Sequence, residues 1–232
     1  MRIGCVILVR YNSHRLPGKA LLSLGNKPLL QHGYDALSTV FTPGNLVVAT
    51  STESTDDAIA AYCEEHHLPY FRGSLTNVSD RFLKAAEAHN FDYVMRINGD
   101  NLFVALPIVR QVVQDTRNSI DFYSNVKDRT FPFGMSVEMV KTSFYQKLMD
   151  QINQSPRYQE HVTLYLYEHE EVGDRQYYYN SEFPEATGIH LSIDTSEDAS
   201  FAKKMLQKLA KPLHTNGLGE ILKTYYQLKA HE

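Results

Sequence analysis

The chain has 232 residues and a formal net charge of −4, and 43% of its residues are hydrophobic. This length can bury a core and support an enzyme cleft, while the acidic balance argues against a general nucleic-acid binder, which needs a basic face. No apolar run approaches the roughly 18 residues of a membrane span, and the polar N-terminal region lacks a signal-peptide pattern. We therefore expect a cytoplasmic protein with no nucleic-acid or membrane partner.

The first half of the chain alternates apolar runs with helical stretches. The runs at 2–9, 45–50 and 92–97 have the pattern of strands buried on both faces of a parallel sheet. Proline at a helix start, a Thr-Asp-Asp cap and one-sided apolar spacing predict the helices, in that order, at 28–40, 55–66 and 77–89. This order predicts an α/β fold with a doubly wound, mostly parallel, Rossmann-like sheet.

The loop after the first predicted strand gathers three cations. Arg10 and Arg15 are planar donors suited to phosphate oxygens, and Lys19 adds a compact charge. Pro17 and Gly18 stiffen one peptide and free the next, so backbone N–H groups can approach an anion. Scattered basic residues more often only coat a surface, but ligands of such sheets bind beyond the carboxyl ends of strands. We predict an exposed, polyphosphate-binding loop that shares one crevice with residues 98–101.

Two aspartates each follow a predicted strand elsewhere in the chain. Asp100 comes after the 92–97 run, and Asp194 ends the stretch "HLSID", which also indicates a strand. Either carboxylate could cap a helix or hold Mg²⁺, which commonly uses one or two carboxylates together with substrate phosphates. Glu197 and Asp198 are interpreted as capping residues of a helix at 195–209. We expect Asp100 and Asp194 to meet at one edge of the sheet, near the basic loop.

From about residue 121 the elements become shorter. The stretches "FYSNV", "SVEMV" and "RQYYYN" indicate strands, and 142–152 and 158–169 indicate helices. The aromatic segment 175–183 is interpreted either as a strand that covers the core or as a subunit contact. In the absence of repeats and linkers, we predict one domain over 1–232 with an excursion at about 121–190.

Several stretches together resemble the cytidylyltransferase family. "RYNSHRLPGKALLSLGNKPLLQH", "SDRF", "RINGDN", "FPFGMSVEMV", "EHVTLYLYEH" and "IDTSED" occur in that family's order. The family activates acidic sugars such as acylneuraminates and 3-deoxy-manno-octulosonate, and this chain looks most similar to its spore-coat polysaccharide biosynthesis branch. The resemblance implies a nucleotidyltransferase fold of the GT-A-like kind and a homodimer. It also implies transfer of CMP from CTP to a sugar acid, with release of pyrophosphate, for surface polysaccharide biosynthesis.

The resemblance further implies roles for individual residues. It implies that the catalytic residues are Arg15, Lys19 and Asp100. The nucleotide-binding residues it implies are Arg10, Ser13, Arg15, Lys19 and Asp100. The Mg²⁺ ligands it implies are Asp100 and Asp194. The substrate-binding residues it implies, on the sugar side of the cleft, are Asp80, Arg81 and Glu138.

Departures from the family pattern leave the base and the sugar open. Leu8, Val9 and His14 replace the family's usual residues near the nucleoside. The segment 102–107 lacks the family's Asp-Pro element, and Ser136 stands where an acid is usual near the sugar pocket. Two alternatives therefore remain: a metal-dependent nucleotide-sugar glycosyltransferase, and a nucleotide-binding relative without turnover.

Overall fold

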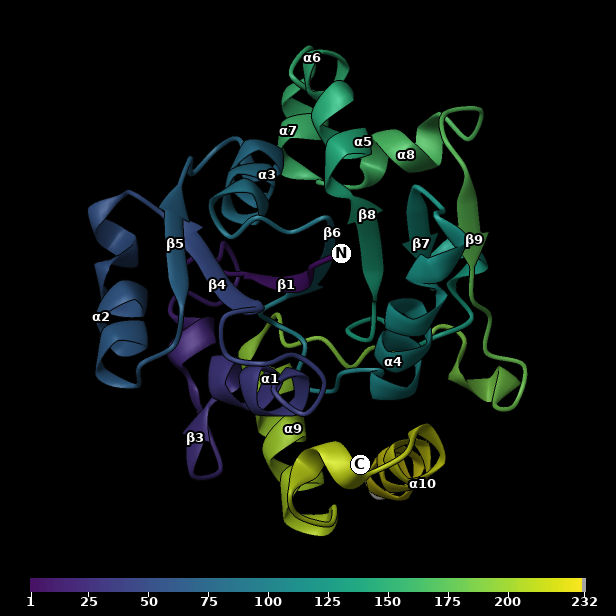
Figure 1. Ribbon diagram of the computed structural model, residues 1–232. Helices are drawn as coiled ribbons and strands as arrows, with labels where there is room; N and C mark the ends of the chain where they lie inside the picture. The colour runs from purple at the N-terminus through teal and green to yellow at the C-terminus, as the bar shows by residue number, and fades with distance from the viewer. Residues whose placement is uncertain (231–232) are drawn as a thin grey trace.

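A seven-stranded sheet runs through the computed structural model, which describes residues 1–230 (Figure 1). From edge to edge the strands are β5 (Tyr70–Gly73), β4 (Leu46–Ser51), β1 (Ile3–Leu8), β6 (Tyr93–Asn98), β8 (Glu138–Lys141), β7 (Phe122–Ser124) and β9 (Arg175–Tyr177). The first four are parallel, β8 runs antiparallel to β6 and β7, and β9 is parallel to β7. The predicted mostly parallel α/β sheet is confirmed.

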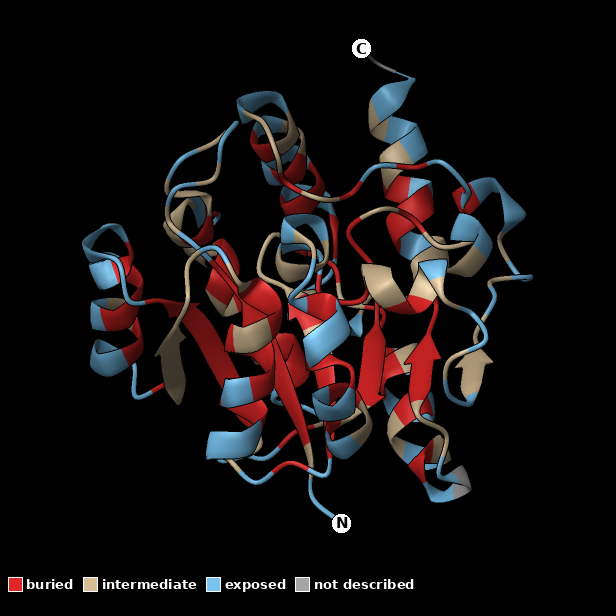
Figure 2. Ribbon diagram, turned by 90° about the horizontal axis from the view of Figure 1, so that it is seen from above, coloured by how far each residue is buried: buried red, intermediate tan, exposed pale blue. Residues whose placement is uncertain are grey.

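Helices cover both faces of the sheet because successive strand residues point to opposite sides. On β1, Cys5 and Ile7 join one apolar cluster, and Val6 and Leu8 join the other. The first cluster contains side chains from α1 (Leu29–Leu37), α2 (Asp57–Glu65), α4 (Leu106–Asp115), α9 (Ser196–Lys208) and α10 (Leu218–Lys229). The second contains α3 (Val78–Ala88), α5 (Thr142–Lys147), α6 (Met149–Ile152), α7 (Pro156–Glu160) and α8 (Leu164–Glu168). Figure 2 shows the strands in the middle of the sheet as buried.

The predicted elements of the first half are confirmed, with small shifts at their ends. The three strands are β1, β4 and β6, and the three helices are α1, α2 and α3. The second helix begins later than expected, since a 3-10 turn at Ser54–Asp56 precedes it. Five elements were missed, namely the hairpin strands β2 (Ser23–Leu24) and β3 (Lys27–Pro28), the edge strand β5, and the helices α4 and α10. The apolar spacing of Leu106, Val109 and Val112 was a usable signal for α4.

In the second half, two predicted helices are each divided and one predicted strand is absent. The 142–152 prediction divides at Leu148 into α5 and α6, and the 158–169 prediction is interrupted at residues 161–163, between α7 and α8. Residues 190–194 form two isolated bridges to different partners, Ser192 with Asn101 and His190 with Phe133, so no continuous ladder forms. The predicted helix at 195–209 is α9, and its predicted cap is confirmed by reciprocal hydrogen bonds between Thr195 and Asp198.

The aromatic segment forms β9 and then leaves the sheet edge. Tyr177 packs edge-on against Phe122 on one face, whereas Tyr178 lies on the other and donates to Asp115 Oδ2 at 2.7 Å. Tyr179 is 50% exposed. The interpretation as a strand is confirmed, and the subunit contact stays a prediction. Among residues 1–230, no helix has the length and apolar character that crossing a bilayer requires.

Candidate active site

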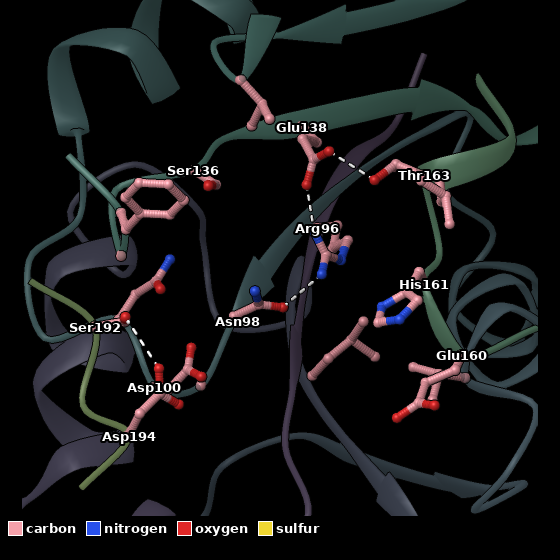
Figure 3. A pocket seen from close by; sticks show the side chains of 18 of the residues that line it. Arg96, Asn98, Asp100, Ser136, Glu138, Glu160, His161, Thr163, Ser192 and Asp194 are labelled. Atoms are coloured by element: carbon pink, nitrogen blue, oxygen red, sulfur yellow. Dashed lines mark hydrogen bonds and ion pairs between the residues drawn. The ribbon is translucent and has the colours of Figure 1, made fainter. Parts of the chain in front are cut away.

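A cleft of about 1120 Å³ opens where β1 and β6 end (Figure 3). Its wall is drawn mainly from residues in the segments 8–20, 96–101, 126–138, 157–170 and 190–194. The two loops that the topology predicts in one crevice, 10–19 and 98–101, therefore do face each other. Segments from the second half of the chain form the far wall.

Lys19 joins the basic loop to both aspartates. Its Nζ donates to Asp100 Oδ2 at 2.8 Å, to Asp194 Oδ1 at 2.9 Å and to the carbonyl of Ile193 at 3.0 Å. Arg15 Nη2 lies 3.0 Å from the other oxygen of Asp194. The expected meeting of Asp100 and Asp194 is therefore found, although Asp194 reaches the site on a bridged segment and not at the end of a strand. Burial opposes ionisation of Asp194, but Lys19 and Arg15 outweigh it and lower the pKa of this carboxyl.

The loop is less uniformly exposed than predicted. The Arg15 side chain is 66% exposed, whereas that of Lys19 is only 12% exposed. The difference arises because Lys19 begins a 3-10 turn, Lys19–Leu21, that directs its ammonium inward between the two carboxylates. Two positive and two negative side chains thus neutralise one another at this end of the cleft.

Asp56 anchors the start of the loop. Its buried carboxylate accepts from Tyr11 N at 2.7 Å, from Thr50 Oγ1 at 2.9 Å and from Ser51 N at 2.8 Å. Burial works against the charged form, but these hydrogen bonds lower the pKa of Asp56 below its usual value. Gly18 closes the loop with φ +75°, and its N–H donates to the carbonyl of Tyr11 at 2.7 Å. Asp56 was missed as an anchor because its Thr-Asp-Asp context was interpreted only as a helix cap.

Asp100 is held in place by the close approach of two strands. The N–H of the preceding Gly99 donates to the carbonyl of Leu8 at 2.9 Å, and any Cβ at Gly99 would overlap the side chain of Val9. The carbonyl of Asp100 accepts from the N–H of Ile193 at 3.2 Å. Glycine is therefore required immediately before Asp100, and Asp100 in turn holds the 190–194 segment.

Glu138 is a structural acid of the cleft wall, since its side chain is 3% exposed. One oxygen accepts from Thr163 Oγ1 at 2.6 Å and Tyr167 Oη at 2.7 Å, and the other is paired with the Arg96 guanidinium (Figure 3). Arg96 also donates to Asn98 Oδ1 at 2.8 Å. The predicted substrate-side residue therefore lines the cleft, but its carboxylate is already occupied by neighbouring donors.

Arg10 and Ser13 lie at the cleft, as predicted. Arg10 is exposed and pairs across the cleft with Glu160, at 3.3 Å between Nη2 and Oε1. Ser13 is partly exposed, and its N–H donates to the carbonyl of Tyr11 at 2.9 Å. Arg10 is thus not a free cation, and an anion that binds it must compete with Glu160.

The Asp80 and Arg81 pair does not act as a unit. Asp80 is absent from the cleft lining and pairs with Lys84 at 3.0 Å, so the structure does not support its predicted contact with substrate, which stays a prediction. The reason is helix geometry, since adjacent residues of α3 point about 100° apart. Arg81 does line the cleft, but it is 2% exposed and donates to the carbonyl of Ser74 at 2.7 Å. Burial lowers the pKa of Arg81 to about 10.

Other residues of the wall were not assigned from the sequence. His161, Thr163 and Tyr167 lie in the quoted stretch "EHVTLYLYEH", and they reach the cleft because the helical run breaks at residues 161–163. Phe133 and His190 stack with ring centroids 4.5 Å apart and planes 13° from parallel. No local signal pairs these two residues, which are far apart in the chain.

The donor set at the cleft suits a cation that arrives with phosphates. Among residues 1–230, no group of three or more His, Cys, Asp or Glu side chains is placed to hold a metal ion by itself. Asp100 and Asp194 supply hard carboxylate oxygens on either side of one ammonium. Such a pair, completed by phosphate oxygens and waters, is the kind of site that Mg²⁺ uses.

Comparisons with known proteins agree with this geometry. The chain is 33% identical over 207 residues to the spore coat polysaccharide biosynthesis protein SpsF of Bacillus subtilis strain 168, covering 88% of this chain and 85% of that protein. A cytidylyltransferase structure from Leptospira borgpetersenii superposes with a TM-score of 0.90 at 28% identity, covering 99% of this chain and 96% of the other. The structure of CMP:2-keto-3-deoxy-manno-octonic acid synthetase complexed with CTP shares the fold, with a TM-score of 0.63 at 16% identity over 90% of this chain and 99% of that one.

The family match extends over almost the whole chain. The cytidylyltransferase family profile matches residues 4–230, which include both aspartates, the basic loop and the far wall of the cleft. The relatives named above cover most of the same length. This chain therefore belongs to the cytidylyltransferase family and is a nucleotidyltransferase enzyme.

Proposed function

We propose that the protein transfers CMP from CTP to a hydroxyl group of an acidic sugar, of the nonulosonic or octulosonic acid type, and releases pyrophosphate. The observation that carries this proposal is the convergence of Arg15, Lys19, Asp100 and Asp194 at one end of a large cleft. Cations there can bind a triphosphate, and the remaining cleft can accept a second substrate beside it.

In the proposed reaction the sugar hydroxyl attacks the α-phosphorus of CTP and the bond to the β-phosphate oxygen breaks. Arg15 and Lys19 bind the triphosphate and stabilise the negative charge that gathers on the departing pyrophosphate. The hydroxyl proton leaves to water or to a carboxylate of the site. Catalysis comes mainly from in-line positioning of the two substrates, because phosphoryl-type transfer needs little covalent help from the protein.

Asp100 and Asp194 are the residues that would hold Mg²⁺ in this proposal. When bound, the ion supplies charge neutralisation at the phosphates. Lys19 is paired with both carboxylates in the structure, so it would have to release them when the ion binds. A triphosphate offers Lys19 new oxygen partners at the same end of the cleft.

The biological role we propose is surface polysaccharide biosynthesis in the cytoplasm. It is supported by the similarity to the spore coat polysaccharide biosynthesis protein of Bacillus subtilis. The alternative of a glycosyltransferase is disfavoured, since a nucleoside-diphosphate sugar does not require three basic residues in the loop.

One assay tests the proposed function. The protein is incubated with each nucleoside triphosphate, Mg²⁺ and a panel of acidic and neutral sugars, and pyrophosphate is measured. We expect release with CTP and a sugar acid, and none when the sugar is omitted. Binding of CTP without release with any sugar would support a relative without turnover, while release of nucleoside diphosphate from a nucleotide sugar would support a glycosyltransferase.

Substitutions in the basic loop should weaken use of CTP. Arg15→Ala and Lys19→Ala are each expected to lower kcat/KM for CTP about tenfold or more, because each removes a charge-assisted contact to phosphate. The measurement is steady-state pyrophosphate release at varied CTP. Lys84→Ala, whose ammonium pairs with Asp80 outside the cleft, is the control. Unchanged kinetics in both loop variants would remove the assignment.

We also propose a homodimer built around the aromatic segment. Tyr179 is 50% exposed just after β9, beside the half-buried Tyr177 and Tyr178, and aromatic side chains are enriched in subunit interfaces. We expect a dimeric mass by light scattering at micromolar concentration, shifted toward monomer by Tyr179→Glu. A monomer at all concentrations would contradict the dimer.

A further inference from the structure

One basic side chain at the surface of the cleft has no acidic partner. Most cations that line the cleft are in ion pairs, namely Arg10, Arg15, Lys19, Arg96, Lys127 and Arg157. Within residues 1–230, the two that lack an ion pair are Arg81, which is almost completely buried, and Arg129, which is exposed. Arg129 is therefore the uncompensated positive charge that a ligand in the cleft can reach.

The Arg129 guanidinium is nevertheless held in a defined place. It lies over the ring of Phe133, 4.9 Å from the centroid, and Phe133 in turn stacks on His190. Its Nη1 also lies 3.4 Å from Ser136 Oγ, a long contact with a neutral group. An aromatic face and a hydroxyl orient the guanidinium without neutralising it.

The backbone at this point is also unusual. Asp128 and Arg129 are successive non-glycine residues with φ of +58° and +50°. Left-handed backbone at such residues costs free energy and persists where the surrounding structure fixes it, often at ligand sites. The Lys127–Arg129 turn thus places the Arg129 side chain on the far wall of the cleft.

We propose that Arg129 binds the carboxylate of the acidic sugar and so determines specificity for an acid over a neutral sugar. This inference rests on the proposed function. Because Arg129 has no carboxylate partner to release, its guanidinium can form a bidentate, charge-assisted pair with an anionic substrate without first breaking an ion pair. Two paired cations of the cleft lining, Arg96 and Lys127, would first have to give up Glu138 and Glu170. Ser136 keeps Arg129 available because a hydroxyl does not compete as a carboxylate would.

The first experiment uses 3-deoxy-manno-octulosonate and N-acetylneuraminate as probes, each compared with its neutral methyl ester. Binding is measured by calorimetry, and KM is measured by pyrophosphate release wherever turnover occurs. We expect the wild type to prefer acid over ester by about tenfold or more, and Arg129→Gln to lose most of that preference. The KM for CTP should stay within about twofold of the wild-type value. Arg110→Gln, an exposed arginine of α4 outside the cleft, controls for loss of surface charge.

A second pair of variants tests the role of Ser136. Ser136→Asp places a carboxylate beside Arg129 and should weaken binding of the acid about as much as Arg129→Gln, whereas the matched neutral variant Ser136→Asn should not. Equal binding of acid and ester by the wild type, failure of the wild type to bind either acid, or an Arg129→Gln protein that keeps its preference would overturn the inference. The proposed function is judged separately, since it fails when the wild type releases no pyrophosphate with any sugar acid of the panel.

Discussion

Asp100→Asn is expected to abolish most CMP transfer while leaving the fold intact. Asparagine has nearly the same size, so packing beside Gly99 and the hydrogen bond from Ile193 to the backbone carbonyl are retained. The change removes one negative charge from the place where cation and phosphates are proposed to meet. Loss of one such preorganised electrostatic contact typically lowers kcat by about 10²–10³. Single-turnover transfer from labelled CTP, at saturating Mg²⁺, is the measurement.

The control for Asp100→Asn is Asp80→Asn, since Asp80 lies in α3 and pairs with Lys84 outside the cleft. Both variants should match the wild type in circular dichroism and in thermal midpoint. Loss of activity in the first variant alone would locate the effect at the cleft. An Asp100→Asn enzyme with full, magnesium-dependent turnover would rule out the mechanism proposed above.

The second large effect concerns stability. Glu138→Ala should lower the free energy of unfolding by about 3–5 kcal/mol, because it leaves the partly buried Arg96 guanidinium without its acid. Thr163 and Tyr167 lose their common acceptor in the same step. Denaturant unfolding followed by circular dichroism measures the change. A similar loss is not expected from a truncation of an exposed acid.

Glu170→Ala supplies that comparison. Glu170 pairs with Lys127 at the rim of the same wall, where water solvates both charges. Exposed ion pairs contribute little to stability. If the two glutamate variants unfold at the same denaturant concentration, the Arg96–Glu138 pair is not the structural contact described here.

The sequence was most informative where a local pattern had one structural solution. The β-branched runs predicted β1, β4 and β6, and the position of Lys19 and Asp100 after two of these strands followed from the fold class. Asp194 was placed correctly, but for a partly wrong reason. Its segment forms no strand, and it reaches the cleft through bridges to Asn101 and Phe133 that no periodicity encodes.

The far wall could not be predicted in the same way. The pairs Arg96 with Glu138 and Phe133 with His190 join residues that are far apart in the chain. The first pair depends on how β8 aligns with β6, and the second depends on how the 190–194 segment aligns with Phe133. Side-chain type alone also could not place Asp80, whose carboxylate a helical rotation directs away from the cleft. Contacts of this kind depend on tertiary register, which the sequence of one chain does not reveal.

The weak attachment of the 190–194 segment has a consequence for the dynamics of the enzyme. The segment has only two isolated bridges, whereas β1 and β6 share a six-residue ladder. Opening must expose the buried side chains of Leu191 and Ile193, but it breaks few backbone hydrogen bonds, so we expect it to require less free energy than global unfolding. Each opening would carry Asp194 away from Lys19 and Asp100 while the sheet stays intact. The fraction of competent enzyme is then governed by a local equilibrium, which amide hydrogen exchange at Leu191 and Ile193 would report.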